Sequence, residues 1–295
     1  DKIPAFYGLF WNRPDLLEHL IDLAEQVKAS AKGEIFHPML YNGFDSIWQK
    51  VAAKEILNIK HNVNITEINR NIDDSNKPIE IKLDNDEIIE CDVLFMAVDQ
   101  RISVKLFTDC TQQERDVFEN LVPFTMVTTL YTNKFDDEEK KPIKFECKIW
   151  PSALLRADGD LFAARHSMRI LREQEWRKKY KNNENTDPEY SVAFQFATPA
   201  SIANDENKAQ YKDTLIKNLQ DKGYEDVKIV EQKYWDNYFP KWSQDEVNKG
   251  YPWLVRDEMQ GKVKNTYYIG SSICFESLLN VIEYNAELAL QLGFK

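Results

Sequence analysis

A glycine and two serines follow a short apolar strand near the end of the chain, in the order Gly270, Ser271, Ser272. The strand is predicted at residues 267–269, and a helix is predicted to begin near Phe275. Glycine lets another molecule approach the backbone closely, and the first N–H groups of a helix can donate to a polar ligand. Such a turn suits a polar cofactor. The pattern alone is equally typical of a plain connection between a strand and a helix, because any parallel strand that enters a helix through Gly-Ser looks similar.

Nucleophilic and metal chemistry find less support in the sequence. Ser271, Ser272 and Cys274 lie outside any GxSxG elbow, and no histidine is near them. The four cysteines show no CxxC spacing, so we expect no structural zinc site. No acid/base pair stands out, which is compatible with an oxidoreductase in which a cofactor carries the chemistry.

Composition restricts the partners and the location. The 295 residues include 38 basic and 49 acidic side chains, a formal net charge of -11, which argues against binding to nucleic acid or to an anionic membrane. No apolar run approaches the roughly 18 residues that span a bilayer, and no signal peptide opens the chain. We therefore expect a cytoplasmic protein with reduced cysteines.

Hydrophobic periodicity predicts a mixed α/β (α+β) fold. Helices are predicted at 14–30 and 44–57, a strand near 63–69, and a hairpin at 79–90. The continuously apolar residues 93–98 are predicted to form a strand covered on both faces and parallel to the strand at 267–269. Within these elements, we expect Trp48, Phe95 and Leu278 to be buried.

A second layer is predicted in the middle of the chain. Alternating patterns predict antiparallel strands at 125–132, 143–150, 161–168, 191–197 and 227–235. A helix at 207–222, ended by Gly223, interrupts them. Thr111 and Glu114 form a capping box for a helix that precedes this layer.

The order of several short segments resembles that of one enzyme family. These segments are WDNYFP at 235–240, YPWL at 251–254, QG at 260–261, the closing strand with its glycine, and the final helix. They resemble the C-terminal portion of flavin-containing amine oxidases and of FAD-dependent relatives that act on small natural products and fatty acids. Residues 44–54, 65–68 and 91–98 follow the same family order upstream.

The resemblance implies two interleaved regions. Residues 36–107 and 260–295 would form a partial FAD/NAD(P)-binding-like layer. Residues 1–35 and 108–259 would form a substrate-binding region built on the antiparallel sheet and helices. The activity implied is an FAD-dependent oxidoreductase that transfers hydride from a small organic substrate to the flavin.

The family pattern also implies cofactor-binding residues. Ile65 would hold the adenine, with an ordinary core isoleucine as the alternative. Gly270 and Ser271 would contact the ribityl and pyrophosphate portion, and the amides of Leu278 and Leu279 would meet the flavin. The cavity beside the flavin would be walled by aromatic side chains, for which a plain core role is the alternative: Trp235, Tyr238, Phe239 and Phe275.

One family feature is missing from the sequence. The GxGxxG turn that receives the FAD pyrophosphate does not occur among its nine glycines. We therefore expect the chain to be the C-terminal part of a flavoprotein, with a missing N-terminal segment that completes the FAD site. This chain alone would bind FAD weakly. The alternative is a non-catalytic binding or scaffold protein that keeps the fold and has lost the cofactor.

Overall fold

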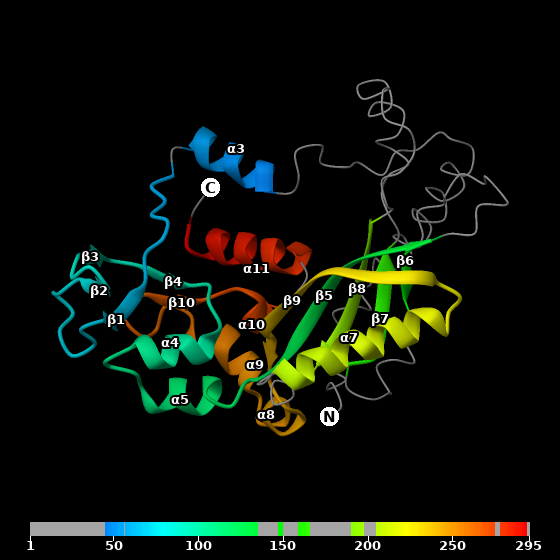
Figure 1. Ribbon diagram of the computed structural model, residues 1–295. Coiled ribbons are helices and arrows are strands. Elements are labelled where there is room, and N and C mark those ends of the chain that lie inside the picture. The colour runs from blue at the N-terminus through cyan, green and yellow to red at the C-terminus, as the bar shows by residue number, and fades with distance from the viewer. Residues whose placement is uncertain are drawn as a thin grey trace. The chain divides into compact units, whose positions relative to one another are not determined.

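The structure is a computed structural model that describes residues 45–55, 57–134, 147–149, 159–165, 190–197, 205–274 and 278–293 (Figure 1). The chain divides into two compact units. Unit 1 combines the chain up to Leu121 with the chain from Trp242 onward, and unit 2 is the continuous stretch Val122–Lys241. The family resemblance instead implies boundaries at 107/108 and 259/260, and it assigns residues 1–35 to the substrate-binding region.

Unit 1 contains two small sheets. The first is antiparallel and has the order β1-β2-β3, formed by Ile65–Asn69, Ile79–Leu83 and Ile88–Cys91. The second pairs β4 (Leu94–Met96) with β10 (Thr266–Tyr268). The β2-β3 pairing, with Asp86 at positive φ in the turn, confirms the predicted hairpin.

Helices make up most of the remaining described residues of unit 1. They are α3 (Asp45–Glu55), α4 (Gln100–Leu106), α5 (Gln112–Phe118), α8 (Gln244–Asn248), α9 (Tyr251–Leu254), the π-helical turn η3 (Val255–Met259), α10 (Ser271–Cys274) and α11 (Leu278–Gln291). Thr111 caps α5 together with Glu114, as the capping box predicts. The helix predicted at 14–30 lies outside the described residues.

The pairing of β4 with β10 is parallel. Thr266 lies opposite Leu94, and Tyr268 lies opposite Met96. This confirms the prediction that two apolar segments distant in the sequence are neighbouring strands. It also fixes the Gly270 turn at the carboxyl end of this small parallel sheet.

One face of β4 is exposed, although the sequence predicted a strand covered on both faces. Leu94 and Met96 are 8% and 5% exposed, whereas Phe95 is 42% exposed and stacks on Tyr267 with ring centroids 5.1 Å apart. The predicted burial of Phe95 is therefore wrong. An apolar run predicts a strand, but it does not reveal whether another layer covers each face.

The predicted burial of Trp48 in α3 is also wrong. The helix forms where expected, but Trp48 is 45% exposed and Val51 is 38% exposed. The spacing of apolar residues predicts that a helix forms. Whether the apolar side of that helix is buried depends on another layer that covers it, which the spacing does not specify. The predicted burial of Leu278 concerns a side chain outside the described part of the structure.

Substitutions of one buried and one exposed phenylalanine, Phe118 and Phe95, test the burial of each side chain. Phe118 is fully buried and packs against Tyr268 with ring centroids 4.8 Å apart. We expect Phe118→Ala to cost about 3–5 kcal/mol of unfolding free energy, and Phe95→Ala to cost only about 1 kcal/mol. Urea denaturation of both variants measures the difference, and equal losses would contradict the exposed position of Phe95.

Unit 2 is built on a five-stranded antiparallel sheet with the order β6-β7-β8-β5-β9. Its strands are Cys147–Ile149, Leu161–Arg165, Tyr190–Ala197, Val122–Lys134 and Glu225–Lys241, in that order. Their described portions confirm the predicted antiparallel strands. The predicted intervening helix is α7 (Asp205–Gln220), followed by Gly223 at φ 85.

Helix α7 packs on one face of this sheet (Figure 1). Alternate sheet residues turn toward it and form an apolar core with residues of the helix and its C-terminal turn: Tyr131, Leu161, Ala164, Ala193, Leu215, Leu219 and Tyr224. A polar contact fixes the same interface, because the fully buried Gln195 donates to the carbonyls of Gly159 and Tyr211. The other residues of each strand face the opposite side.

Candidate functional site

The turn after β10 has a conformation that requires glycine. Gly270 has φ +90, and a Cβ at this position would lie 2.8 Å from the backbone oxygen of Ala97, just beyond β4. Its own carbonyl accepts hydrogen bonds from the backbone N–H groups of Ile273 and Cys274 and from the Cys274 thiol. The close approach of the two strand ends therefore explains the glycine.

Two serine hydroxyls follow this glycine at the start of α10. Ser271 is partly exposed, and Ser272 is 4% exposed. Ser272 Oγ has no hydrogen-bond partner within the described part of the chain. A buried hydroxyl without a partner is costly unless water or a ligand binds it. The turn thus offers one accessible and one unsatisfied hydroxyl.

Two glutamines hold the strand ends beside the turn. The side chain of Gln260 donates to the carbonyl of Tyr268 and accepts from its N–H. The buried side chain of Gln100 donates to the carbonyls of Met96 and Ile269, and so connects the ends of β4 and β10. Among the described residues, no third strand pairs with β4 or β10. The two glutamine side chains therefore hydrogen-bond to backbone groups at the strand ends.

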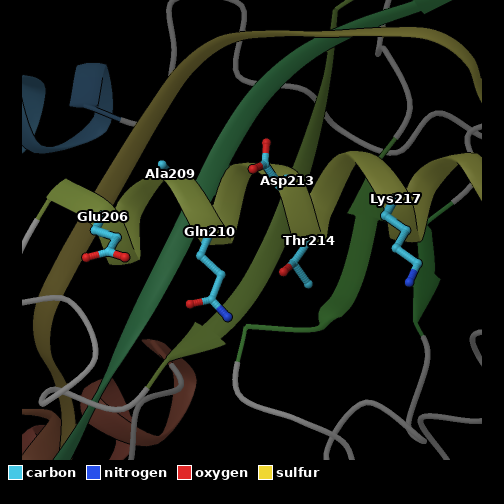
Figure 2. Close-up of a pocket in the computed structure, with 6 residues that line it drawn as sticks. All are labelled: Glu206, Ala209, Gln210, Asp213, Thr214 and Lys217. Carbon is cyan, nitrogen blue, oxygen red and sulfur yellow. The ribbon is translucent and has the colours of Figure 1, made fainter.

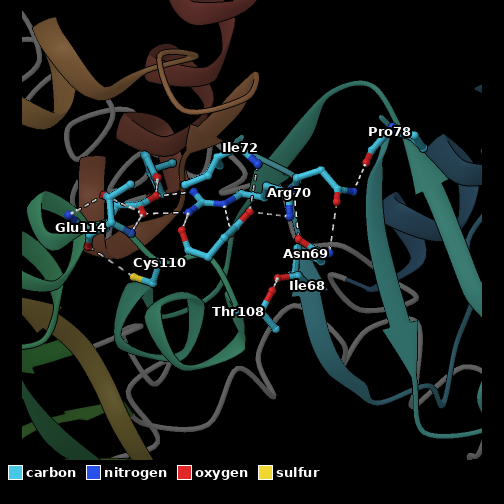
Figure 3. Close-up of polar contacts among 12 residues, drawn as sticks. Ile68, Asn69, Arg70, Ile72, Pro78, Thr108, Cys110 and Glu114 are labelled. Atoms are coloured by element: carbon cyan, nitrogen blue, oxygen red, sulfur yellow. Dashed lines mark hydrogen bonds and ion pairs between the residues drawn. The ribbon is translucent and has the colours of Figure 1, made fainter. Parts of the chain in front are cut away.

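A buried ion-pair network connects the end of β1 with α5 (Figure 3). Arg70, directly after β1, is fully buried, and its guanidinium contacts both carboxylate oxygens of Glu114. It also donates from Nε to Asp109 at 2.9 Å and stacks over the ring of Phe107 at 3.9 Å from the centroid. Every side of this guanidinium is therefore paired or packed.

Tyr268 extends the network into β10. Its hydroxyl donates to Glu114, which also accepts hydrogen bonds from the N–H and the hydroxyl of Thr111. Burial acts to raise the pKa of Glu114, but the hydrogen bond and charge of Arg70 outweigh it and lower that pKa. Burial and the nearby carboxylate raise the pKa of Tyr268. Near neutral pH the site is a fixed ion pair that positions β10.

The sequence did not predict this network. The capping box predicts a local role for Glu114, yet Arg70 is 44 positions away and belongs to no motif. No pattern in the sequence could have paired them. Through the hydrogen bond from Tyr268 to Glu114, the network holds the strand that leads into the Gly270 turn.

The predicted cofactor residues all belong to unit 1. Gly270 and Ser271 form the turn after β10, and Leu278 and Leu279 begin α11. Ile65 begins β1 in the other sheet and is 41% exposed, so the alternative of an ordinary core isoleucine is wrong.

The predicted substrate residues are distributed differently. Trp235, Tyr238 and Phe239 belong to β9 in unit 2, whereas Phe275 lies outside the described residues. Trp235 is 49% exposed, and its Nε1 donates to Thr128 at 2.8 Å. Phe239 is only 6% exposed, so its plain core alternative describes its environment better.

Aromatic residues that the sequence reasoning missed surround this part of unit 2. Phe124 contacts Phe196 and Tyr238, with ring centroids 4.9 and 5.4 Å apart, and Phe162 contacts Phe196 at 4.8 Å. Alternation along β5 and β8 could have predicted these residues, because every second residue of a strand points to the same face, here the face opposite α7.

Other candidate sites are weaker. A hollow of about 510 Å3 lies along the outer side of α7, but its six lining residues all come from that one helix (Figure 2). In the described ranges, no cluster of three histidine, cysteine or acidic side chains could hold a metal ion. No described helix has the length and apolar character to cross a membrane.

Comparison with solved structures relates the fold to known enzymes. A fatty acid isomerase from P. acnes that produces CLA matches 90% of this chain with a TM-score of 0.64 and 19% identity. A putative protoporphyrinogen oxidase from Exiguobacterium matches 86% at 0.56 and 16% identity, and reduced UDP-galactopyranose mutase matches 84% at 0.56 and 10% identity. The chain spans 55%, 51% and 51% of those three proteins.

Sequence comparisons add no closer relative, since no family model and no curated protein matches. The structural matches establish the fold alone: the chain has the mixed α/β fold, with parallel and antiparallel sheets, of the fatty acid isomerase, the putative protoporphyrinogen oxidase and the mutase. This confirms the fold class predicted from the sequence.

Proposed function

We propose that the chain is part of an FAD-dependent oxidoreductase of the flavin amine oxidase type. The observation that carries this proposal is the fold likeness, which extends over 84–90% of the chain in the three structures described above. FAD, when bound, would supply the acceptor for hydride taken from a small organic substrate.

The turn after β10 has groups that suit part of this cofactor. The unsatisfied hydroxyl of Ser272 and the partly exposed Ser271 can donate to ribityl or phosphate oxygens. The first N–H groups of the 14-residue α11, at Leu278 and Leu279, lack partners within their helix and would orient toward the flavin. Ile65 would contact the adenine through its backbone.

The remaining cofactor contacts would come from a glycine-rich segment outside these 295 residues. This sequence contains no GxGxxG, and the chain spans about half the length of the matched structures. A loss of about 4 kcal/mol in phosphate binding would weaken FAD binding roughly 1000-fold. We therefore expect weak, exchangeable FAD on this chain alone and tight FAD when the segment is present.

Flavin titration tests the proposal directly. FAD and ADP-ribose are titrated into the purified chain, and binding is followed by flavin fluorescence and calorimetry. We expect FAD to bind more tightly than ADP-ribose, because the residues present favour the flavin half. Ser272→Ala should weaken FAD binding about 5-fold, whereas Thr214→Ala on α7 should leave it unchanged.

Two results would contradict parts of this proposal. Equal binding of FAD and ADP-ribose, or none of either, would remove the flavin site and support the cofactor-free binding protein. Stoichiometric FAD in a denatured extract of the chain would keep the flavoenzyme but overturn the need for another segment.

A further inference from the structure

The face of the unit 2 sheet opposite α7, here termed the open face, carries apolar side chains from β5, β8 and β9. The strand register places Met126 of β5 between Phe196 of β8 and Trp235 of β9. Two residues further along β5, Thr128 lies between Phe194 of β8 and Lys233 of β9. Neighbouring residues in register point to the same face, so these side chains form one surface.

Among the described residues of unit 2, no helix covers the open face. Helix α7 is the one helix among the described residues of unit 2. It packs on the other face of the sheet, where Tyr211 contacts Val127 and Ala197. Trp235 is 49% exposed, and Phe124, Phe162 and the other members are partly exposed. A cluster of partly exposed aromatic rings at this density is a typical site for an apolar ligand.

The charged groups beside these rings are mainly basic. The ammonium group of Lys233 lies 5.5 Å from the Trp235 ring, and that of Lys241 lies 4.7 Å from the Phe124 ring. The carboxylate of Asp236 accepts a hydrogen bond from the fully buried Thr125, which belongs to the α7 side of the sheet.

The acidic residue of β9 on the open face, Glu231, lies further from the aromatic cluster than Lys233 does. Glu231 lies opposite Leu130, one row beyond the position of Lys233 opposite Thr128. The aromatic end of the open face therefore combines apolar area with positive charge. A ligand with an apolar body and one negative charge complements both features.

We propose that the open face binds an apolar molecule carrying one anionic group, with the body on Trp235, Met126 and Phe196 and the anion at Lys233. The inference rests on the proposed function, because it names the substrate class of that oxidoreductase. It needs no flavin for its test, since every residue involved belongs to unit 2.

Three probes of equal chain length separate the possible charges: octanoate, octan-1-ol and octyltrimethylammonium. Each is titrated by calorimetry into the full chain near neutral pH at low salt. We expect octanoate to bind most tightly and octyltrimethylammonium least. Raising the salt concentration should weaken octanoate binding and leave octan-1-ol unaffected.

Three variants locate the site. Lys233→Gln should weaken octanoate about 5-fold and leave octan-1-ol unchanged, because only the charge contact is lost. Trp235→Ala should weaken both ligands about 10-fold. Lys212→Gln on the exposed side of α7 removes the same charge elsewhere and should change neither affinity. Thermal unfolding of each variant verifies that it is folded.

The proposal is overturned if octanoate fails to bind, if octyltrimethylammonium binds more tightly, or if Lys233→Gln and Lys212→Gln have equal effects. These outcomes are independent of the flavin titration. Octanoate binding without any flavin preference would keep this surface and reject the flavoenzyme, while flavin binding without octanoate binding would do the reverse.

Discussion

Replacing Glu114 by alanine is expected to destabilise the protein by about 3–5 kcal/mol, because it leaves Arg70 as a buried charge without its main partner. Both side chains of this pair are fully buried. The same substitution removes the acceptor for the Tyr268 hydroxyl and breaks the capping box with Thr111. Urea denaturation followed by far-UV circular dichroism measures the loss.

A surface glutamate provides the matched control. Glu119 pairs with Arg115 at 3.3 Å, but these side chains are 50% and 41% exposed. Glu119→Ala should therefore cost less than about 1 kcal/mol. The double variant Arg70→Met/Glu114→Leu should recover much of the loss, because it removes the unpaired charge. A Glu114→Ala variant as stable as Glu119→Ala would contradict the buried ion pair.

The network also predicts a pH dependence. Because the folded pKa of Glu114 lies below its ordinary value of 4.5, its stabilising contribution is present above that value. The contribution is lost as the pH falls through the lowered folded pKa. Unfolding free energies measured between neutral pH and pH about 3 should therefore fall less steeply in Glu114→Gln than in the wild type. Parallel curves would contradict the lowered pKa.

Gly270→Ala is expected to cost about 2–4 kcal/mol of stability. Its φ of +90 is unfavourable for any residue with a Cβ, and the added atom would lie 2.8 Å from a backbone oxygen that cannot move independently of the strand. The substitution should also weaken FAD binding, because the turn would shift. Chemical denaturation and the flavin titration measure the two effects separately.

Gly250→Ala separates backbone strain from the clash. Gly250 has φ +85, and a Cβ there would have nothing within 4 Å. We expect a cost of about 1 kcal/mol from the left-handed conformation alone, and no change in flavin binding. Equal effects of the two substitutions would mean that the contact between Gly270 and Ala97 has no energetic consequence.

The sequence predicted the elements of this fold more reliably than their surroundings. Alternation identified β2, β3, β5 and β8, and short apolar runs identified the parallel pair β4 and β10. These signals are local, because strand formation and hairpin turns depend on neighbouring residues. The capping box of Thr111 and Glu114 is local in the same way.

Burial was harder to predict because it depends on distant parts of the chain. Phe95 and Trp48 have the apolar character of core residues, and they differ from Phe118 only in what covers them. The Arg70–Glu114 pair depends on the three-dimensional approach of β1 and α5, which no spacing encodes. The aromatic open face was detectable from alternation in two strands, but its assembly required the pairing register.

The insertion of unit 2 within unit 1 has a consequence for synthesis on the ribosome. Val122 and Lys241, the ends of the insertion, are register partners in β5 and β9, and Trp242 then donates from its indole to the carbonyl of Val117. At typical elongation rates, roughly 10–30 s separate the synthesis of β4 from that of β10. Unit 2 can complete its sheet during this interval, whereas β4 cannot pair with β10 until the later strand has been synthesised. Until β10 is made, the backbone groups of β4 that pair with it form an unpaired strand edge in the nascent chain.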